Sequence, residues 1–162
     1  MITCADCNKP MTSKAETLRS SDCGLPDVTL LGVEVRRCAA CGDHELVLPK
    51  IEQLHRAIAL AVIGKRARLT GDEVRSLRKY LGWSGVAFAK HMGVTAESVS
   101  RWENAREPLG STADRLVRLM VVTQAPVSAD SLDDLVDVDA PAAPLHLELE
   151  PERGGWRARG AA

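Results

Sequence analysis

Residues 70–108 read TGDEVRSLRKYLGWSGVAFAKHMGVTAESVSRWENAREP, and this stretch decides the architecture of the chain. Three short helical patterns follow one another in it, separated by turns of a few residues. Thr70 followed by Glu73 forms a capping box, which predicts the start of the first helix. Apolar residues then recur at intervals of three and four, as one buried helix face requires: Val74, Leu77 and Leu81.

The second and third helical patterns carry their own start and stop signals. Ser84 and Thr95 are residue types that cap helix N-termini by accepting backbone N–H bonds. Gly93 lies between the two helices and suits the positive φ of a sharp turn. Val99 and Trp102 are the large apolar residues of the third helix and are expected to face inward. Two helices joined by a short glycine-containing turn form the helix-turn-helix pattern, whose second helix enters the major groove of DNA.

Five residues of this stretch are expected to contact DNA. The outer face of the third helix carries Glu97, Ser98 and Arg101. Arg101 can donate two bonds to guanine O6 and N7, whereas Glu97 can only accept, so it favours the cytosine amino group or excludes a phosphate. Thr95 is expected to offer its hydroxyl to a phosphate, and Arg106 to hold the DNA backbone just past the helix. An ion pair with Glu97 is the competing interpretation of Arg101, and such pairs contribute only ~0.3–0.5 kcal/mol.

Charge is segregated along the chain, although the net charge of the whole chain is only −1. Residues 65–122 carry eleven Lys/Arg and six Asp/Glu, a net charge of +5, whereas residues 1–64 have −1 and residues 123–162 have −5. The helix-turn-helix segment is therefore the basic one, as phosphate neutralisation requires. Lys65, Arg66 and Arg68 form a basic junction in front of it, which either contacts the DNA backbone or is simply solvated.

Two CxxC pairs predict a metal site in the first part of the chain. Cys4 and Cys7 form the first pair and Cys38 and Cys41 the second, with thirty residues between them. Four thiolates satisfy tetrahedral Zn²⁺ and leave no open position, so we expect one structural Zn²⁺ per chain. A redox CxxC is the alternative, but no βαβ pattern surrounds either pair.

The residues around the two pairs fit a small β module. Asn8 and Gly42 suit the tight turns that follow each pair. The segment 27–37 reads DVTLLGVEVRR, which is β-branched and partly alternating, and its glycine suggests a break between the strands of a hairpin. Cys23 is expected to be a free thiol, with an exchanged ligand or an oxidation sensor as alternatives. His44 could replace a thiolate but is expected to be solvated.

The remaining segments complete the expected organisation. Pro49 opens a connecting helix whose apolar stripe packs either within the chain or on a partner. Ser111 caps a further helix over 112–122, and the acidic segment beyond Gln124 is expected to be mobile, with one possible helical turn at 132–136. The expected fold is mostly α: a zinc-binding module with a small β structure in 1–48, a connecting helix in 49–68, a four- to five-helix helix-turn-helix domain in 69–124, and an acidic, Pro-containing flexible tail in 125–162.

The run from Trp83 to Pro108 resembles the Xre/lambda-repressor type of helix-turn-helix. Gly85 stands where that family usually has Gln, and Ala105 where it usually has Gly after the third helix. The matched positions are Phe88-Ala89, Gly93-Val94-Thr95, the run from Val99 to Glu103, and Arg106. The order of a CxxC…CxxC module, a connecting helix and this helix-turn-helix is similar to MqsA-type antitoxins, also called the YgiT-type zinc-finger/helix-turn-helix family, over residues 1–122.

This resemblance implies a sequence-specific DNA-binding repressor, the antitoxin of a type II toxin–antitoxin pair, which autoregulates its operon and holds a toxin protein with its N-terminal module. A stand-alone Xre-type regulator and a protein-interaction module with weak DNA binding are the alternatives. Because one recognition helix covers few base pairs, a homodimer on a palindromic operator is expected. No catalytic grouping indicates an enzyme, and the absence of signal-peptide and membrane-helix patterns predicts a cytoplasmic protein.

Overall fold

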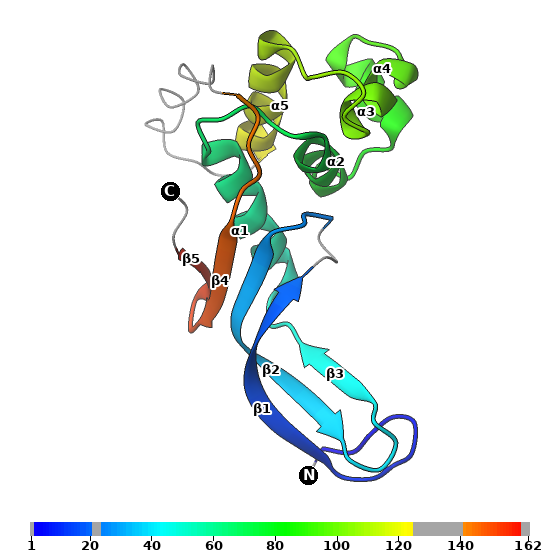
Figure 1. The fold of residues 1–162 in the computed structure, drawn as a ribbon, viewed down its shortest axis with the longest axis vertical. Helices are drawn as coiled ribbons and strands as arrows, with labels where there is room; N and C mark the ends of the chain where they lie inside the picture. Colours follow the sequence, from blue (N-terminus) through cyan, green and yellow to red (C-terminus); the bar gives the residue numbers. More distant parts are fainter. Residues whose placement is uncertain (1, 21–23, 125–140, 160–162) are drawn as a thin grey trace.

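The computed structural model describes residues 2–20, 24–124 and 141–159; the possible helical turn at 132–136 lies outside them. Figure 1 shows an elongated molecule with the helices α2 to α5 at one end and the N-terminal loop with the ends of β1 to β3 at the other. No helix of the described part combines the length and the apolar character that crossing a membrane requires. The elements in chain order are β1 (Met11–Ser20), β2 (Val28–Cys38), β3 (His44–Val47), α1 (Ile51–Gly64), α2 (Gly71–Tyr80), α3 (Gly85–Met92), α4 (Ala96–Glu103), α5 (Ser111–Gln124), β4 (Leu147–Glu152) and β5 (Gly155–Arg159).

The prediction of a mostly-α chain with a small β module is wrong, because the described residues form five helices and a five-stranded mixed sheet. β1 and β2 are ten and eleven residues long and pair antiparallel. The hairpin predicted within 27–37 is also wrong, since β2 continues through Gly32. The register shifts at this point, so that Leu31 and Gly32 together face Thr17 in a β-bulge. The φ of 63° at Gly32 is the conformation that glycine tolerates best.

The C-terminal strands belong to the same sheet, although the sequence predicts a flexible tail there. β4 pairs in parallel with residues 28–30 of β2, and β5 pairs antiparallel with β4. Leu147 and Leu149 are buried in β4 and alternate with glutamates, which is the period of a strand with one buried face. The Trp156 indole N–H donates to the Pro49 carbonyl at 2.7 Å, which fastens the hairpin to the chain in front of α1.

The starts of α2, α3 and α4 agree with the local signals in the sequence, whereas α5 already begins at Ser111, the predicted cap, and runs to Gln124. The Thr70 hydroxyl accepts from the Glu73 backbone N–H, and the Glu73 carboxylate accepts from the Thr70 N–H at 2.7 Å, so the predicted capping box is formed. Ser84 and Thr95 cap α3 and α4 as predicted. Gly93 ends α3 with a φ of 67°. Local hydrogen-bonding groups therefore determine where these helices begin and end.

α1 joins the two ends of the molecule through one apolar core. Its buried residues include Leu54, Ile58 and Val62, which belong to the same cluster as residues of β2, β4 and the helices α2 to α5. α1 contacts β5 on one side and α2 and α5 on the other. The apolar stripe of α1, for which packing within the chain and packing on a partner were both predicted, therefore packs within the chain.

A buried ion pair in α5 orders the junction between α1 and α2. Arg118 Nε lies 2.6 Å from Asp114 Oδ1, and their side chains are 1% and 0% exposed. Asp114 also accepts the Leu69 N–H at 2.7 Å. Because both charged side chains form hydrogen bonds with backbone groups of the junction, they fix the path of the chain there. The remaining guanidinium donors bind the carbonyls of Ile63, Lys65 and Ala67.

Candidate metal centre and nucleic-acid interface

Two matching backbone turns present the four cysteines. The Asn8 N–H donates to the carbonyl of Cys4, and the Gly42 N–H donates to the carbonyl of Cys38, at 3.0 Å in both turns. Asn8 and Gly42 have φ values of 57° and 79°, in the left-handed region that Asn and Gly tolerate best. The prediction that these two residues form tight turns after the CxxC pairs is confirmed.

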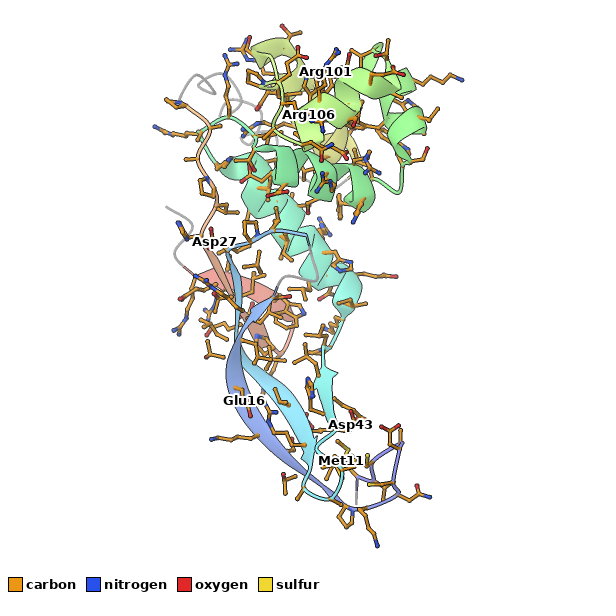
Figure 2. All side chains as sticks on the ribbon, turned by 45° about the vertical axis from the view of Figure 1, so that its right-hand side comes forward. Met11, Glu16, Asp27, Asp43, Arg101 and Arg106 are labelled. Carbon is orange, nitrogen blue, oxygen red and sulfur yellow. The ribbon has the colours of Figure 1, made fainter. Side chains whose placement is uncertain are left out.

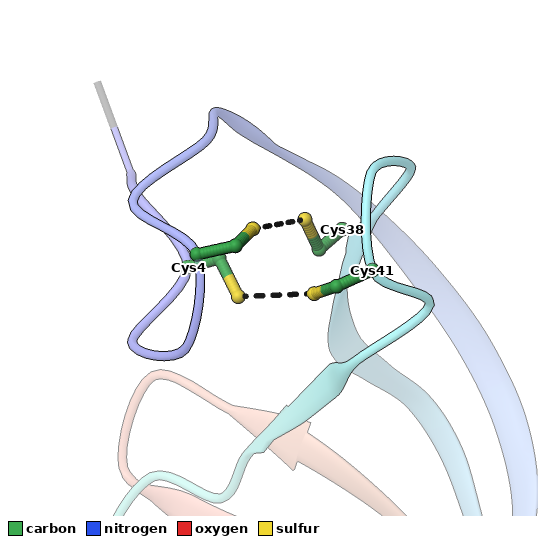
Figure 3. Close-up of side chains that lie close together, drawn as sticks. Cys4, Cys38 and Cys41 are labelled. Atoms are coloured by element: carbon green, nitrogen blue, oxygen red, sulfur yellow. Dashed lines mark hydrogen bonds between the residues drawn. The ribbon is translucent and has the colours of Figure 1, made fainter.

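The four thiols converge on one point, and Figure 3 shows them facing one another across the two turns. The Cys4 and Cys41 sulfurs are 3.6 Å apart, the Cys7 and Cys38 sulfurs 3.4 Å, and all four lie within 4.8 Å of one another. Four sulfurs at ~2.3 Å from a tetrahedral Zn²⁺ would lie about 3.8 Å apart, so this spacing fits the ion. A four-thiolate set leaves no ligand position for water, which suits a structural ion.

The thiol pKa values differ across this cluster. Backbone N–H groups, of Cys41 first, lower the pKa of the Cys38 thiol to about 7. The backbone N–H of Asp43 lowers the pKa of Cys41, but the three neighbouring thiols outweigh it and raise this pKa to about 12. Four adjacent thiols cannot all ionise without a compensating cation. A divalent ion supplies that charge, so its binding would release protons from the cluster.

Asp43 and His44 follow the second cysteine pair and stand outside this ligand set. His44 is exposed at the start of β3, where it pairs with Arg37, and it is not part of the cysteine cluster. Cys23 lies outside the described residues. Asp43 has a carboxylate oxygen 3.7 Å from the Cys4 sulfur, close enough to accept from the thiol. The sequence does not signal this contact, because a single Asp after a CxxC pair is unremarkable.

α4 keeps one face in the core and the other in solvent. Val99 and Trp102 are buried, as predicted. Figure 2 shows Arg101 and Arg106 at the helical end of the molecule, far from the cysteine loops. The five residues predicted to contact DNA lie at the start of α4, on its outer face or just behind it, and all except the half-buried Ser98 are exposed: Thr95, Glu97, Ser98, Arg101 and Arg106.

Arg101 forms an ion pair with Glu107 and not with Glu97, the partner considered from the sequence. Its Nε lies 2.9 Å from a Glu107 oxygen, and its Nη2 donates to the Ser98 hydroxyl at 3.2 Å. Its charge reaches Glu97 only at a distance: the pKa of Glu97 is lowered mainly by its own backbone N–H and the Thr95 hydroxyl, and less by Arg101. Half of each side chain in the Arg101–Glu107 pair is exposed, and such pairs contribute ~0–1 kcal/mol. Arg101 can therefore leave this pair for DNA at small cost.

A Schellman motif ends α4. The Ala105 N–H donates to the Trp102 carbonyl at 3.1 Å, and the Arg106 N–H donates to the Arg101 carbonyl at 2.9 Å. Ala105 occupies the left-handed position with a φ of 53°, where the Xre family usually has Gly. The motif turns the chain so that Arg106 follows directly behind the helix. The Arg106 side chain has no hydrogen bond or ion pair with any residue in the described ranges.

Two arginines of α2 clamp the end of α4. Glu103 accepts from Arg78 Nε at 2.5 Å and from Arg75 Nε at 3.4 Å. Arg75 also donates to the Glu103 carbonyl at 2.9 Å. Gly71 permits the close approach, because a Cβ there would lie 2.6 Å from the Trp102 carbonyl oxygen and 2.8 Å from that of Glu103. Local patterns do not reveal this clamp, since it joins residues at least 25 positions apart.

The basic junction in front of α2 is only partly available to DNA. Lys65 forms an ion pair with Glu73 at 2.6 Å, and the two side chains are 7% and 2% exposed. Arg68 is half-buried and donates to the Leu109 carbonyl at 3.2 Å. Arg66 is exposed. Contact of Lys65 with the DNA backbone is therefore excluded in this arrangement of the chain.

Comparison with known protein families finds a helix-turn-helix domain at residues 70–135, less than half of the chain. The described part of this match contains α2 to α5, with the clamped α4 and its exposed face. Neither the curated proteins nor the solved structures contain a match to this chain. The helix-turn-helix domain supports a DNA-binding regulator. The match covers no residue of the cysteine cluster, and it does not show that the chain belongs to the MqsA-type family.

Proposed function

We propose that this chain is a sequence-specific transcriptional repressor that acts by binding DNA rather than by catalysis. The observation that carries the proposal is the outer face of α4: a capped and clamped helix with an exposed arginine on its surface and a second one directly behind it. Such a helix enters the major groove with its N-terminal residues toward the bases. The net charge of +5 over residues 65–122 supports binding to phosphate.

The proposed contacts follow from the chemistry of each side chain. Arg101 leaves Glu107 and donates two bonds to guanine O6 and N7, while Glu97 accepts from a cytosine amino group. Thr95 keeps its capping role and offers its hydroxyl to a phosphate. Arg106 binds a phosphate as a sequence-independent anchor. The Arg101 contact specifies the base, and the Arg106 contact fixes the register of the helix.

A homodimer on a palindromic operator is part of the proposal. One recognition helix reads too few base pairs for specificity, and a two-fold dimer places two helices about 10 base pairs apart, or a multiple of that. The apolar stripe of α1 is already buried within the chain. Leu119 of α5, by contrast, is 43% exposed beside the half-buried Leu116 and Met120. We therefore place the dimer contact on α5.

The antitoxin role rests on the resemblance to MqsA-type antitoxins. In that proposal, the four cysteines hold one structural Zn²⁺, the N-terminal module binds a toxin protein, and α4 represses the operon that encodes both. The elongated shape supports two separate binding functions, because the cysteine loops and α4 lie at opposite ends of the molecule (Figure 1). A stand-alone regulator is the alternative, and it would have the same DNA-binding end without a toxin partner.

Sequencing of the DNA that the protein retains in its own cells tests this proposal. The expected result is a small set of sites that share an inverted repeat, with one site in front of the gene for this chain. A small protein that co-purifies and whose gene is adjacent would support the antitoxin over the stand-alone regulator. Recovery of DNA without any shared motif would contradict sequence-specific repression.

A further inference from the structure

A cavity of about 280 Å³ lies beneath the C-terminal end of α4. α2 lines it with Gly71 and Val74, α4 with Trp102, and the loop in front of α5 with Pro108 and Leu109. Val74, Trp102 and Leu109 are core residues, so the walls belong to the packed part of the domain. The volume is close to the lower end, about 300 Å³, of the range for small-molecule sites.

Arg68 brings a positive charge to the wall of this apolar cavity. Its Nη1 donates to the Leu109 carbonyl at 3.2 Å, which holds the guanidinium in place. The other guanidinium donors have no hydrogen-bond or ion-pair partner within residues 2–20, 24–124 and 141–159. A guanidinium offers a carboxylate two parallel bonds, and an apolar surrounding strengthens them. The group that fits these donors is therefore a carboxylate.

Glu107 also lines the cavity, but its charge is already compensated. Its carboxylate pairs with Arg101 at 2.9 Å. Arg68 has no carboxylate partner of its own in the described chain. The uncompensated charge at the cavity is thus positive, and a ligand with a negative charge is favoured over a neutral or cationic one of the same shape.

We propose that this cavity binds a small organic acid, with an aromatic body against Val74 and Trp102 and a carboxylate on Arg68. Its regulatory meaning rests on the proposed function, because the ligand contacts both α4 and the helix that clamps it. In the proposed DNA complex Arg101 leaves Glu107, and this carboxylate then lies unpaired at the cavity that holds the anion. Occupancy is therefore expected to lower the affinity for operator DNA.

Binding is measured on the full-length protein without DNA, so that the cavity is tested separately from the repressor function. The probes are phenylacetate and 2-naphthoate, each beside its neutral amide, in calorimetric titrations and in NMR spectra of the Trp102 indole N–H. The carboxylates are expected to bind one per chain, to shift the Trp102 signal, and to bind at least fivefold more tightly than their amides. No saturable binding of either carboxylate, or equal affinity for acid and amide, would overturn the site.

A pair of arginine variants assigns the carboxylate contact. Arg68→Gln is expected to remove the preference for acid over amide while leaving the amide affinity nearly unchanged. Arg66→Gln is the matched control, because Arg66 is exposed, lies two positions away and does not line the cavity. If Arg66→Gln abolishes the preference as fully as Arg68→Gln, general charge attraction explains the binding and the assignment is wrong.

Coupling to DNA is measured last. Saturating 2-naphthoate is expected to lower operator affinity by about fivefold or more, the lower end of typical allosteric coupling, whereas 2-naphthamide at the same concentration leaves it unchanged. Unchanged operator affinity with the cavity filled would refute the regulatory role. If the protein binds no operator in any condition, the proposed repressor function fails, while the acid-binding site stands or falls with the titrations above.

Discussion

Arg101 is the residue on which the reading of DNA sequence depends most directly. Its present partners, Glu107 and Ser98, are exposed groups that compete weakly with a guanine edge. Arg101→Ala is expected to weaken operator binding by ~1–3 kcal/mol, the value of a good bidentate base contact, and to relax the preference at one base pair. Titration of operators with single base-pair changes measures both effects.

Arg106→Ala is the comparison for that variant. Because Arg106 is expected to bind phosphate, its loss should weaken operator and random duplexes by the same factor and reduce the salt dependence of binding. If Arg101→Ala leaves the affinities for operator and random DNA unchanged, the outer face of α4 is not the reading surface.

The backbone conformation of Ala105 leads to a prediction about folding stability rather than DNA recognition. It holds the left-handed position of the Schellman motif with a φ of 53°, which costs an Ala ~1–2 kcal/mol that a Gly does not pay. Since Gly also loses more entropy on folding, Ala105→Gly is expected to raise the free energy of unfolding by a net of about 0.5–1 kcal/mol. Urea denaturation followed by circular dichroism measures the change.

Ala96→Gly is the matched control, because Ala96 is exposed at the start of α4 with ordinary helical geometry. Glycine in that position is expected to lower the free energy of unfolding. If Ala105→Gly and Ala96→Gly destabilise the protein equally, the left-handed backbone at residue 105 does not determine how α4 ends.

At the scale of elements, the helices follow from local sequence and the sheet does not. Caps at Thr70, Ser84 and Thr95 lie within three residues of the groups they bind, so a one-dimensional pattern contains them. β2 pairs with β1, β3 and β4, and its pairing with β4 joins residues more than a hundred positions apart. The alternation of Leu147 and Leu149 with glutamates is visible in the sequence, but the strand that covers them is not.

The candidate sites divide in the same way. The four cysteines follow from motif spacing, and the turns at Asn8 and Gly42 follow from residue type. The clamp of Glu103 by Arg75 and Arg78, and the partner of Arg101, depend on how separate helices meet. No local pattern specifies a contact of that kind, because it is created by tertiary packing.

The C-terminal hairpin is expected to be a structural part of the sheet. Leu149 of β4 is fully buried in the shared core, so Leu149→Ala should lower the free energy of unfolding by ~2–5 kcal/mol. Glu148→Ala, on the exposed face of the same strand, should change it by less than about 0.5 kcal/mol. Equal and small effects in urea denaturation would mean that β4 does not contribute to the fold.

At the scale of the whole molecule, the cysteine cluster is expected to stabilise one end only. The loops that carry it have few buried apolar side chains besides the cysteines themselves, so the metal must supply much of their folding energy. Removal of the ion with a chelator should expose the amides of residues 2–10 and 38–44 to hydrogen exchange. The amides of α2 to α5, whose buried side chains belong to the apolar core rather than to the cysteine loops, should remain protected.

Elemental analysis and a pair of variants complete that prediction. One zinc per chain is expected in the purified protein, Cys41→Ser should lower this content, and His44→Ala should leave it unchanged because His44 lies outside the cluster. Full protection of the cysteine loops in a protein that contains no metal would show that the ion is not needed for their fold.

The claim that this chain reads DNA sequence is tested most directly by one titration. Fluorescence anisotropy compares the operator found by sequencing with a shuffled duplex of the same composition, at several salt concentrations. Specific binding is expected to be at least about a thousandfold tighter than binding to the shuffled duplex, and log affinity should fall linearly with log salt concentration. Equal affinity for the two duplexes at every salt concentration would contradict the account.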